Sequence, residues 1–242
     1  MASVLAVIAR YIGAALVGYL CGSLPSGVLV GKFFGNVDPR ESGSGKTGAT
    51  NVLRTLGPGA AILVGLTDLA KGVVPVLLAR YVIFPSQPTF FPINSAARDL
   101  ALWAEAIAGI AALVGHNHSI FIRFTGGRGV ATGAGVIVAM QPWALAVGFV
   151  GFALPIAITR YVSLGSMIGS AACAVADAVF VAAPKSFPIH DVYQHLAFMV
   201  VGAAYVIYSH RDNITRLRDG TERKIGRSEQ PVTGSAKRPA QD

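Results

Sequence analysis

The chain has 242 residues, of which 53% are apolar and only 13% are charged, and its formal net charge is +8. Because so few charged side chains cannot cover the surface of a soluble protein of this length, the composition excludes an ordinary soluble domain and indicates an integral membrane protein. The two cysteines and the histidine spacing match neither a disulfide framework nor a metal site, and no nucleic-acid motif accompanies the positive charge. We therefore expect no metal, no cofactor and no nucleic-acid partner.

Seven apolar runs, nearly free of charge, are candidates for helices that cross the hydrocarbon core, which requires about 20 residues of α-helix. They cover residues 3–24, 60–82, 100–114, 130–140, 143–159, 164–183 and 192–208. The first run lacks a basic start and is longer than the apolar region of a signal peptide, so we interpret it as a retained span. The fourth and fifth runs are short and meet at Gln141-Pro142, where one long tilted helix is the alternative.

These runs predict an all-α, polytopic membrane bundle of about seven helices, formed by residues 1–225. Lysine and arginine are concentrated in alternate loops and in the C-terminal tail, so the positive-inside rule places those segments in the cytoplasm and the amino terminus outside. The cations of this set are Lys32, Arg40, Lys46, Arg54, Arg123, Arg128, Arg160, Arg211, Arg216, Arg218, Arg223, Lys224, Arg227, Lys237 and Arg238. Such a charge also favours contact with anionic membrane lipids. Residues 226–242 are polar, and we expect a disordered cytoplasmic tail there.

The first cytoplasmic loop contains Gly45-Lys46-Thr47, which is the end of a nucleotide-binding P-loop motif. A P-loop also requires a glycine five positions earlier, and that position is Arg40. The segment is therefore not a P-loop. It remains a glycine- and hydroxyl-rich loop with two cations, Lys46 and Arg54, and such loops can hold an anion.

Two further polar segments are predicted on the same side of the membrane. In Phe124-Thr-Gly-Gly-Arg-Gly129, the glycines let the backbone approach a ligand closely, and the following helix directs its positive end to the same place. This segment predicts a phosphate site with an added guanidinium. The other segment is divided between residues 160–166 and His210-Arg-Asp-Asn213, at the end of the last apolar run.

Short polar or glycine-rich motifs recur along nearly the whole chain: Gly22-Ser-Leu-Pro-Ser-Gly27, Ser42-Gly-Ser-Gly, Gly48-Ala-Thr-Asn-Val-Leu-Arg54, Asp68-Leu-Ala-Lys-Gly72, Gly115-His, Gly126-Gly-Arg-Gly-Val-Ala-Thr132, Tyr161-Val-Ser-Leu-Gly-Ser166, His210-Arg-Asp-Asn-Ile and Gly220-Thr-Glu-Arg-Lys-Ile225. With these motifs in this order, the chain resembles the acyl-phosphate-dependent glycerol-3-phosphate acyltransferases of bacteria, the PlsY family. The family usually has Asn and a small or apolar residue at Lys46-Thr47, and Lys-Gly-Gly-Lys-Gly at residues 125–129. Of the two lysines, the second is replaced by Arg128, which keeps the positive charge, and the first by Thr125, which loses it. Lys46 can restore that lost charge from the opposite loop.

The resemblance implies transfer of a fatty acyl group from acyl phosphate to the 1-hydroxyl of sn-glycerol 3-phosphate, at the cytoplasmic side of the bacterial inner membrane. The product is lysophosphatidic acid, the first intermediate of phospholipid synthesis. The residues that it assigns to catalysis are Ser44, Arg54, Ser163, His210 and Asn213. Those assigned to substrate binding, with Lys46 added for its charge, are Gly45, Lys46, Gly48, Thr50, Asn51, Gly126, Gly127, Arg128 and Gly129.

Ser44 has no base or orienting partner in the sequence pattern, so a hydrogen-bonding role is preferred over that of a nucleophile. We expect substrate-assisted catalysis, in which His210 holds Asn213 and a phosphate in place. Asp68 and Lys71 are expected to form an ion pair within the membrane, since unpaired charge is costly there. The alternative function is a small membrane transporter of organic phosphates, whose cytosolic loops would grip the anion.

Overall fold

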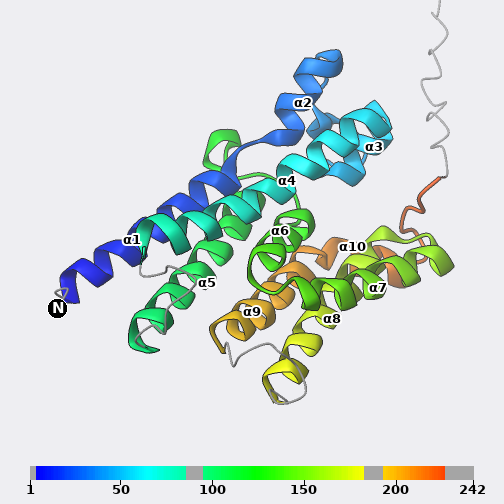
Figure 1. Cartoon of the computed structure of the whole chain (residues 1–242). Coiled ribbons are helices and arrows are strands. Elements are labelled where there is room, and N and C mark those ends of the chain that lie inside the picture. Colours follow the sequence, from blue (N-terminus) through cyan, green and yellow to red (C-terminus); the bar gives the residue numbers. More distant parts are fainter. Residues whose placement is uncertain (1–3, 86–94, 183–192, 227–242) are drawn as a thin grey trace, which may run out of the picture.

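The computed structural model describes residues 4–85, 95–182 and 193–226, and all of its regular elements are helices (Figure 1). The α-helices are α1 (Val4–Ser23), α2 (Ser26–Gly35), α3 (Ala49–Leu56), α4 (Pro58–Leu78), α5 (Ser95–Asn117), α6 (Val130–Met140), α7 (Pro142–Thr159), α8 (Val162–Ala182), α9 (Tyr193–Ser209) and α10 (Arg211–Arg218). Short 3₁₀ turns cover Pro39–Glu41 and Ile120–Ile122, and a π-helical turn, Ala79–Ile83, extends α4. The predicted disordered tail lies, apart from Gly226, outside the described residues.

The predicted spans correspond to helices, although their lengths differ from what the sequence indicates. Within the described residues, five helical segments are long and apolar enough to cross a membrane: Val4–Gly35, Pro58–Ile83, Arg98–Asn117, Pro142–Thr159 and Val162–Ala182. Helices α6 and α9 have 11 and 17 residues. At 1.5 Å per residue α6 is only about 16 Å long, roughly half of a hydrocarbon core. The number of crossings and the orientation of the termini therefore stay predictions.

Two helices, rather than one long tilted helix, occupy residues 130–159. Helix α6 ends at Met140, and α7 begins at Pro142. The break is at Gln141, whose backbone (φ −144°, ψ 74°) is not helical. Proline is favoured at the first position of a helix, where its missing N–H costs no hydrogen bond, and the pair Gln141-Pro142 therefore starts a new helix in a new direction. The two-helix prediction is confirmed, and the single-helix alternative is wrong.

Small residues bring the helices into close contact. Helix α1 packs along α5, α4 along α6, and α7 along α8 (Figure 1). A Cβ on Gly22 would collide with the backbone of Ala112, and one on Gly135 would collide with the backbone of Leu69. Glycine allows such backbone approach in membrane helices. The glycines of α1 and α6 are thus used for packing, and the cavity described below forms between the helices that they position.

A buried ion pair lies in the middle of α4, and the hydroxyl of Ser26 ties it to the start of α2. The Lys71 Nζ lies 2.7 Å from the Asp68 Oδ1, and both side chains are buried. Ser26 donates a hydrogen bond to the same carboxylate oxygen at 2.5 Å and accepts one from Lys71 at 2.8 Å. Because each buried polar atom of the group has a partner, the charge is tolerated in an apolar bundle. The predicted ion pair is confirmed, and it fixes the start of α2 under the first loop.

A second charged network lies near the opposite end of α4 and α5. Arg80 donates to both carboxylate oxygens of Glu105, at 2.8 and 2.6 Å, and to the carbonyl oxygen of Ala139 at 2.9 Å. The His195 Nε2 lies 3.2 Å from Glu105. The network therefore connects the extension of α4 with α5, α6 and α9 at the end remote from the polar loops.

Candidate functional site

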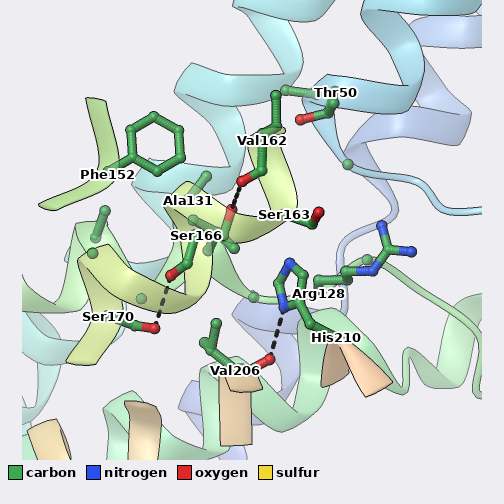
Figure 2. A pocket seen from close by; sticks show the side chains of 18 of the residues that line it. Thr50, Arg128, Ala131, Phe152, Val162, Ser163, Ser166, Ser170, Val206 and His210 are labelled. Carbon is green, nitrogen blue, oxygen red and sulfur yellow. Dashed lines mark hydrogen bonds between the residues drawn. The ribbon is translucent and has the colours of Figure 1, made fainter. Parts of the chain in front are cut away.

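A cavity of about 550 Å³ begins among the polar loops and extends between α5, α6, α7, α8 and α9. Its outer end is lined by polar and charged side chains from the two glycine-rich loops, α8 and α10. Its inner part is lined by apolar side chains, among them Leu113, Ile137, Phe152, Cys173 and Met199. Figure 2 shows Arg128, Ser163 and His210 gathered at one side of the view and Phe152 at the other. The cavity therefore suits a ligand with a charged head and an apolar tail.

The first loop is organised by the amide of Asn51 in α3. Its Nδ2 donates to the carbonyl oxygens of Pro39, Ser42 and Lys46 at 2.6, 3.2 and 2.9 Å, and its Oδ1 accepts the Ser44 N–H at 2.8 Å. Asn51 is buried, with 2% of the residue exposed. Although Asn51 lines the cavity, its hydrogen-bonding capacity is used by the loop, so it shapes the site that Ser44 presents.

The glycines of the second loop fit closely over His116. The Gly127 N–H donates to the His116 carbonyl oxygen at 3.1 Å, and a Cβ on Gly127 would collide with the His116 imidazole. His116 is itself buried, with its Nδ1 3.6 Å from the Asp68 carboxylate. Gly129 has φ +81°, in the left-handed region, and precedes the first residue of α6. These glycines are therefore required by the fold of the loop, and the Gly127 N–H is not free to bind a phosphate.

Arg128 is the side chain of the second loop that projects into the cavity. Its Nε is buried and has no hydrogen-bond partner among the described residues. Burial lowers the pKa of its guanidinium, and the nearby Arg216 lowers it further, while Glu222 acts in the opposite direction. A buried guanidinium nitrogen without a partner is costly. An anion in the cavity would satisfy it.

Lys46 faces the same part of the cavity from the first loop. Burial lowers the pKa of its ammonium group, and the next largest cause is the positive charge of Arg128. Thr125 stands at the position of the lysine that this chain lacks, and its hydroxyl donates to the Ile122 carbonyl oxygen at 2.7 Å. Thr125 is not one of the described residues that line the cavity. The structure thus places the Lys46 cation of the first loop at the same cavity as Arg128, and its role in replacing the missing lysine stays a prediction.

A carboxylate that the sequence analysis missed organises the C-terminal side of the site. The Glu222 side chain is buried, and it accepts hydrogen bonds from Ser163, Asn213 and Arg216 at 2.7, 2.6 and 2.8 Å. Burial would raise the pKa of Glu222, but these three hydrogen bonds together hold it below its usual range. Glu222 lies within the motif Gly220-Thr-Glu-Arg-Lys-Ile225, which was the available signal. It positions Ser163 and Asn213 from two different elements.

His210 is buried at the start of α10, and its imidazole lies near Arg128 and Ser163 (Figure 2). Its Nδ1 lies 2.8 Å from the Val206 carbonyl oxygen, which can only accept, so Nδ1 carries the proton and Nε2 the lone pair. Burial is the main cause that lowers the pKa of His210 to about 4, and Arg128 contributes. The imidazole is therefore neutral near pH 7.

We expected the His210 side chain to hold Asn213 in place, but the two side chains have other partners in the structure. The Asn213 side chain donates to Glu222 at 2.6 Å, and the contact with His210 is between backbone atoms, the Asn213 N–H and the His210 carbonyl oxygen, at 2.8 Å. Because the Nδ1–H of the neutral His210 is bound to Val206, the remaining nitrogen, Nε2, is a hydrogen-bond acceptor. A phosphate oxygen needs a donor, so this nitrogen does not suit a phosphate. Nε2 is suited instead to a substrate hydroxyl.

The structure brings most of the sequence-predicted residues together. The cavity is lined by Ser44, Lys46, Gly48, Thr50, Asn51, Arg54, Gly127, Arg128, Gly129, Ser163, His210 and Asn213. Gly45 and Gly126 are not part of this lining within the described chain. Gly45 has φ +67° in a turn closed by a hydrogen bond to Ser42, and Gly126 packs on the backbone of His116. In the described part of the chain, no three His, Cys, Asp or Glu residues form a group that could hold a metal ion.

Comparison with known proteins gives consistent matches over most of the chain. The family model described as glycerol-3-phosphate acyltransferase matches residues 12–220. A glycerol-3-phosphate acyltransferase of Nostoc sp. is 43% identical over 213 residues, which are 87% of this chain and 90% of that protein. One of Anaeromyxobacter dehalogenans is 39% identical over 217 residues, covering 88% of this chain and 98% of that protein.

A solved structure shares the fold. The crystal structure of PlsY, an integral membrane glycerol 3-phosphate acyltransferase, in its glycerol 3-phosphate form, superposes with a TM-score of 0.73 at 32% identity. The match covers 89% of this chain and 96% of that one. Sequence and structure thus agree over most of the chain, and the chain belongs to the glycerol-3-phosphate acyltransferase family.

Proposed function

We propose that the protein transfers a fatty acyl group from acyl phosphate to the 1-hydroxyl of sn-glycerol 3-phosphate, releasing inorganic phosphate and 1-acyl-sn-glycerol 3-phosphate. The observation that carries this proposal is the single cavity that joins a cationic end to an apolar interior. Both substrates have a phosphate, and only the donor has an acyl tail. One cavity of this kind can therefore hold the two reactants side by side.

The acceptor phosphate is assigned to the second loop and Lys46. Arg128 contributes a guanidinium with an unpartnered buried nitrogen, Lys46 approaches it from the first loop, and α6 begins directly after Gly129. The positive end of α6 adds to the attraction for a dianion. Besides burial, the charge of Arg128 lowers the pKa of Lys46, and a phosphate between the two cations would offset this repulsion.

The donor is assigned to the first loop and α3. Ser44, held by Asn51, lines the cavity together with Arg54 and with Thr50, which Figure 2 shows. These groups would hydrogen-bond the donor phosphate and the developing oxyanion. The tail would occupy the apolar interior between α6, α7, α8 and α9. Each buried methylene contributes about 0.8 kcal/mol to binding.

In the proposed reaction, the 1-hydroxyl oxygen of the acceptor attacks the carbonyl carbon, and the bond from that carbon to the phosphate oxygen breaks. The proton passes to an oxygen of the departing phosphate, so the substrate supplies its own base. His210 orients the attacking hydroxyl by accepting its hydrogen bond at Nε2. Its low pKa supports this role, because an imidazole of pKa about 4 is a weak base toward a hydroxyl.

The excess of cations in the loops around the cavity supports a position of the site on the cytoplasmic side of the bacterial inner membrane, with the amino terminus outside. Water-soluble glycerol 3-phosphate would reach the site from the cytoplasm, and the acylated product would remain in the bilayer. The family match favours the acyltransferase over the transporter alternative.

The donor is tested by incubating purified protein in detergent with glycerol 3-phosphate and, in separate reactions, palmitoyl phosphate, palmitoyl-CoA and palmitoyl acyl-carrier protein. We expect lysophosphatidic acid only from the acyl phosphate, together with an equal amount of inorganic phosphate. Product from acyl-CoA or acyl-carrier protein alone, with none from acyl phosphate, would contradict the proposed donor.

A further inference from the structure

The segment after α10, residues 219–226, which we call the C-terminal strap, is held across the polar end of the cavity. Glu222 is bound by Ser163 and Asn213 as described above. The Ile225 N–H donates to the Arg160 carbonyl oxygen at 2.9 Å. The Lys224 Nζ lies 5.2 Å from the centroid of the Tyr161 ring, a cation–π contact. The strap is thus attached to α8, to α10 and to the connection between α7 and α8, on both sides of residue 223.

Arg223 extends from this strap toward the first loop. Its side chain is half-buried and lines the cavity. Its Nη1 lies 3.8 Å from the position that a Cβ on Gly43 would occupy. Gly43 has φ +60° and directly precedes Ser44, whose N–H is fixed by Asn51. The Arg223 guanidinium and Ser44 therefore lie at the same edge of the cavity, although they come from opposite ends of the chain.

We propose that Arg223 is a substrate-binding residue that contacts the phosphate of the acyl donor. This inference rests on the proposed function, which assigns the donor to the Ser44 side of the cavity. The fixed attachment of the strap limits the positions open to the guanidinium, so less freedom is lost when it binds a ligand. A guanidinium presents paired N–H donors that match the oxygens of a phosphate. Arg223 and Arg54 would then hold the donor phosphate from two sides.

The test is steady-state kinetics of Arg223→Ala with each substrate varied in turn. A charge-assisted hydrogen bond of the usual strength predicts a rise of about tenfold to a hundredfold in the KM for acyl phosphate. The KM for glycerol 3-phosphate should stay near the wild-type value. Arg223→Lys should recover part of the loss, because it keeps the charge without the paired donors. Arg218→Ala, at the exposed end of α10, is the matched control and should behave as wild type.

An unchanged KM for acyl phosphate would overturn the inference. An equal rise in both KM values would also overturn it, since that pattern indicates a structural role for the strap. If the wild-type protein does not use acyl phosphate at all, the proposed function fails, and the inference is then tested by calorimetric titration with a non-reactive palmitoyl phosphonate. Weaker binding by Arg223→Ala supports the inference, and equal binding by the two proteins overturns it.

Discussion

The role of His210 can be tested through the substitution His210→Gln. Glutamine can keep the hydrogen bond to the Val206 carbonyl oxygen, but it cannot accept a proton. In the structure, the pKa of His210 is lowered to about 4, from an ordinary value of about 6.5, mainly by burial. This lowering of the pKa corresponds to about 3 kcal/mol of free energy by which the folded protein disfavours the protonated imidazole. At pH 7 roughly one imidazole in a thousand is protonated, so forming the imidazolium in the reaction would be unfavourable.

The assay is turnover at saturating substrates between pH 5.5 and 8.5, for the wild type and His210→Gln. A general base contributes about a hundredfold to ten-thousandfold to the rate. If the departing phosphate takes the proton, we expect His210→Gln to lose less than about tenfold, the size of one misplaced hydrogen bond. Its pH–rate profile should keep the wild-type shape. A variant that is folded and binds both substrates but has lost more than about a hundredfold would refute substrate-assisted catalysis.

The same substitution has a consequence for stability whose sign follows from the pKa. Between pH 6.5 and about 4, the imidazole of the unfolded chain binds a proton and that of the folded chain does not. Protonation therefore stabilises the unfolded state, and the wild type should lose up to about 3 kcal/mol relative to His210→Gln as the pH falls through this range. Above pH 6.5 the difference should be constant. Thermal unfolding in detergent at several pH values measures it, and a constant difference down to pH 4 would contradict the buried, neutral His210.

Three further substitutions test other parts of the site. Glu222→Gln should weaken the hold on Ser163, Asn213 and Arg216 and reduce turnover by about tenfold or more, measured as kcat with the fold checked by thermal unfolding. Arg54→Ala should lose at least about a hundredfold in kcat/KM, and full recovery by Arg54→Lys would show that paired donors are unnecessary. Gly127→Leu should displace His116 and impair the kinetics with both substrates as well as thermal stability, whereas an effect confined to the KM for glycerol 3-phosphate would show direct obstruction of that ligand.

Much of the site could be predicted from the sequence because its residues are grouped in short motifs. Ser44 and Thr50 belong to one loop and its helix, and Gly127 and Arg128 to another. Local composition and spacing were enough to predict that both segments bind an anion, and the structure places residues of both along one cavity. The sequence also marked Gln141-Pro142 as a hinge, since proline acts on the backbone of its own neighbourhood, but it left one long tilted helix as an alternative that the structure then excluded.

The sequence alone determined the all-helical membrane class, the places of the apolar helices and the relevance of the glycine-rich loops, because these depend on neighbouring residues and their periodicity. Only the tertiary structure decided which groups share a surface. It placed Glu222 against Ser163, which is 59 residues away in the sequence, and Gly127 over His116. It also directed the Asn51 amide toward the backbone of the first loop. Burial and distance set the pKa of His210 and the partners of each hydrogen bond, and both are properties of the packed chain that no local pattern contains.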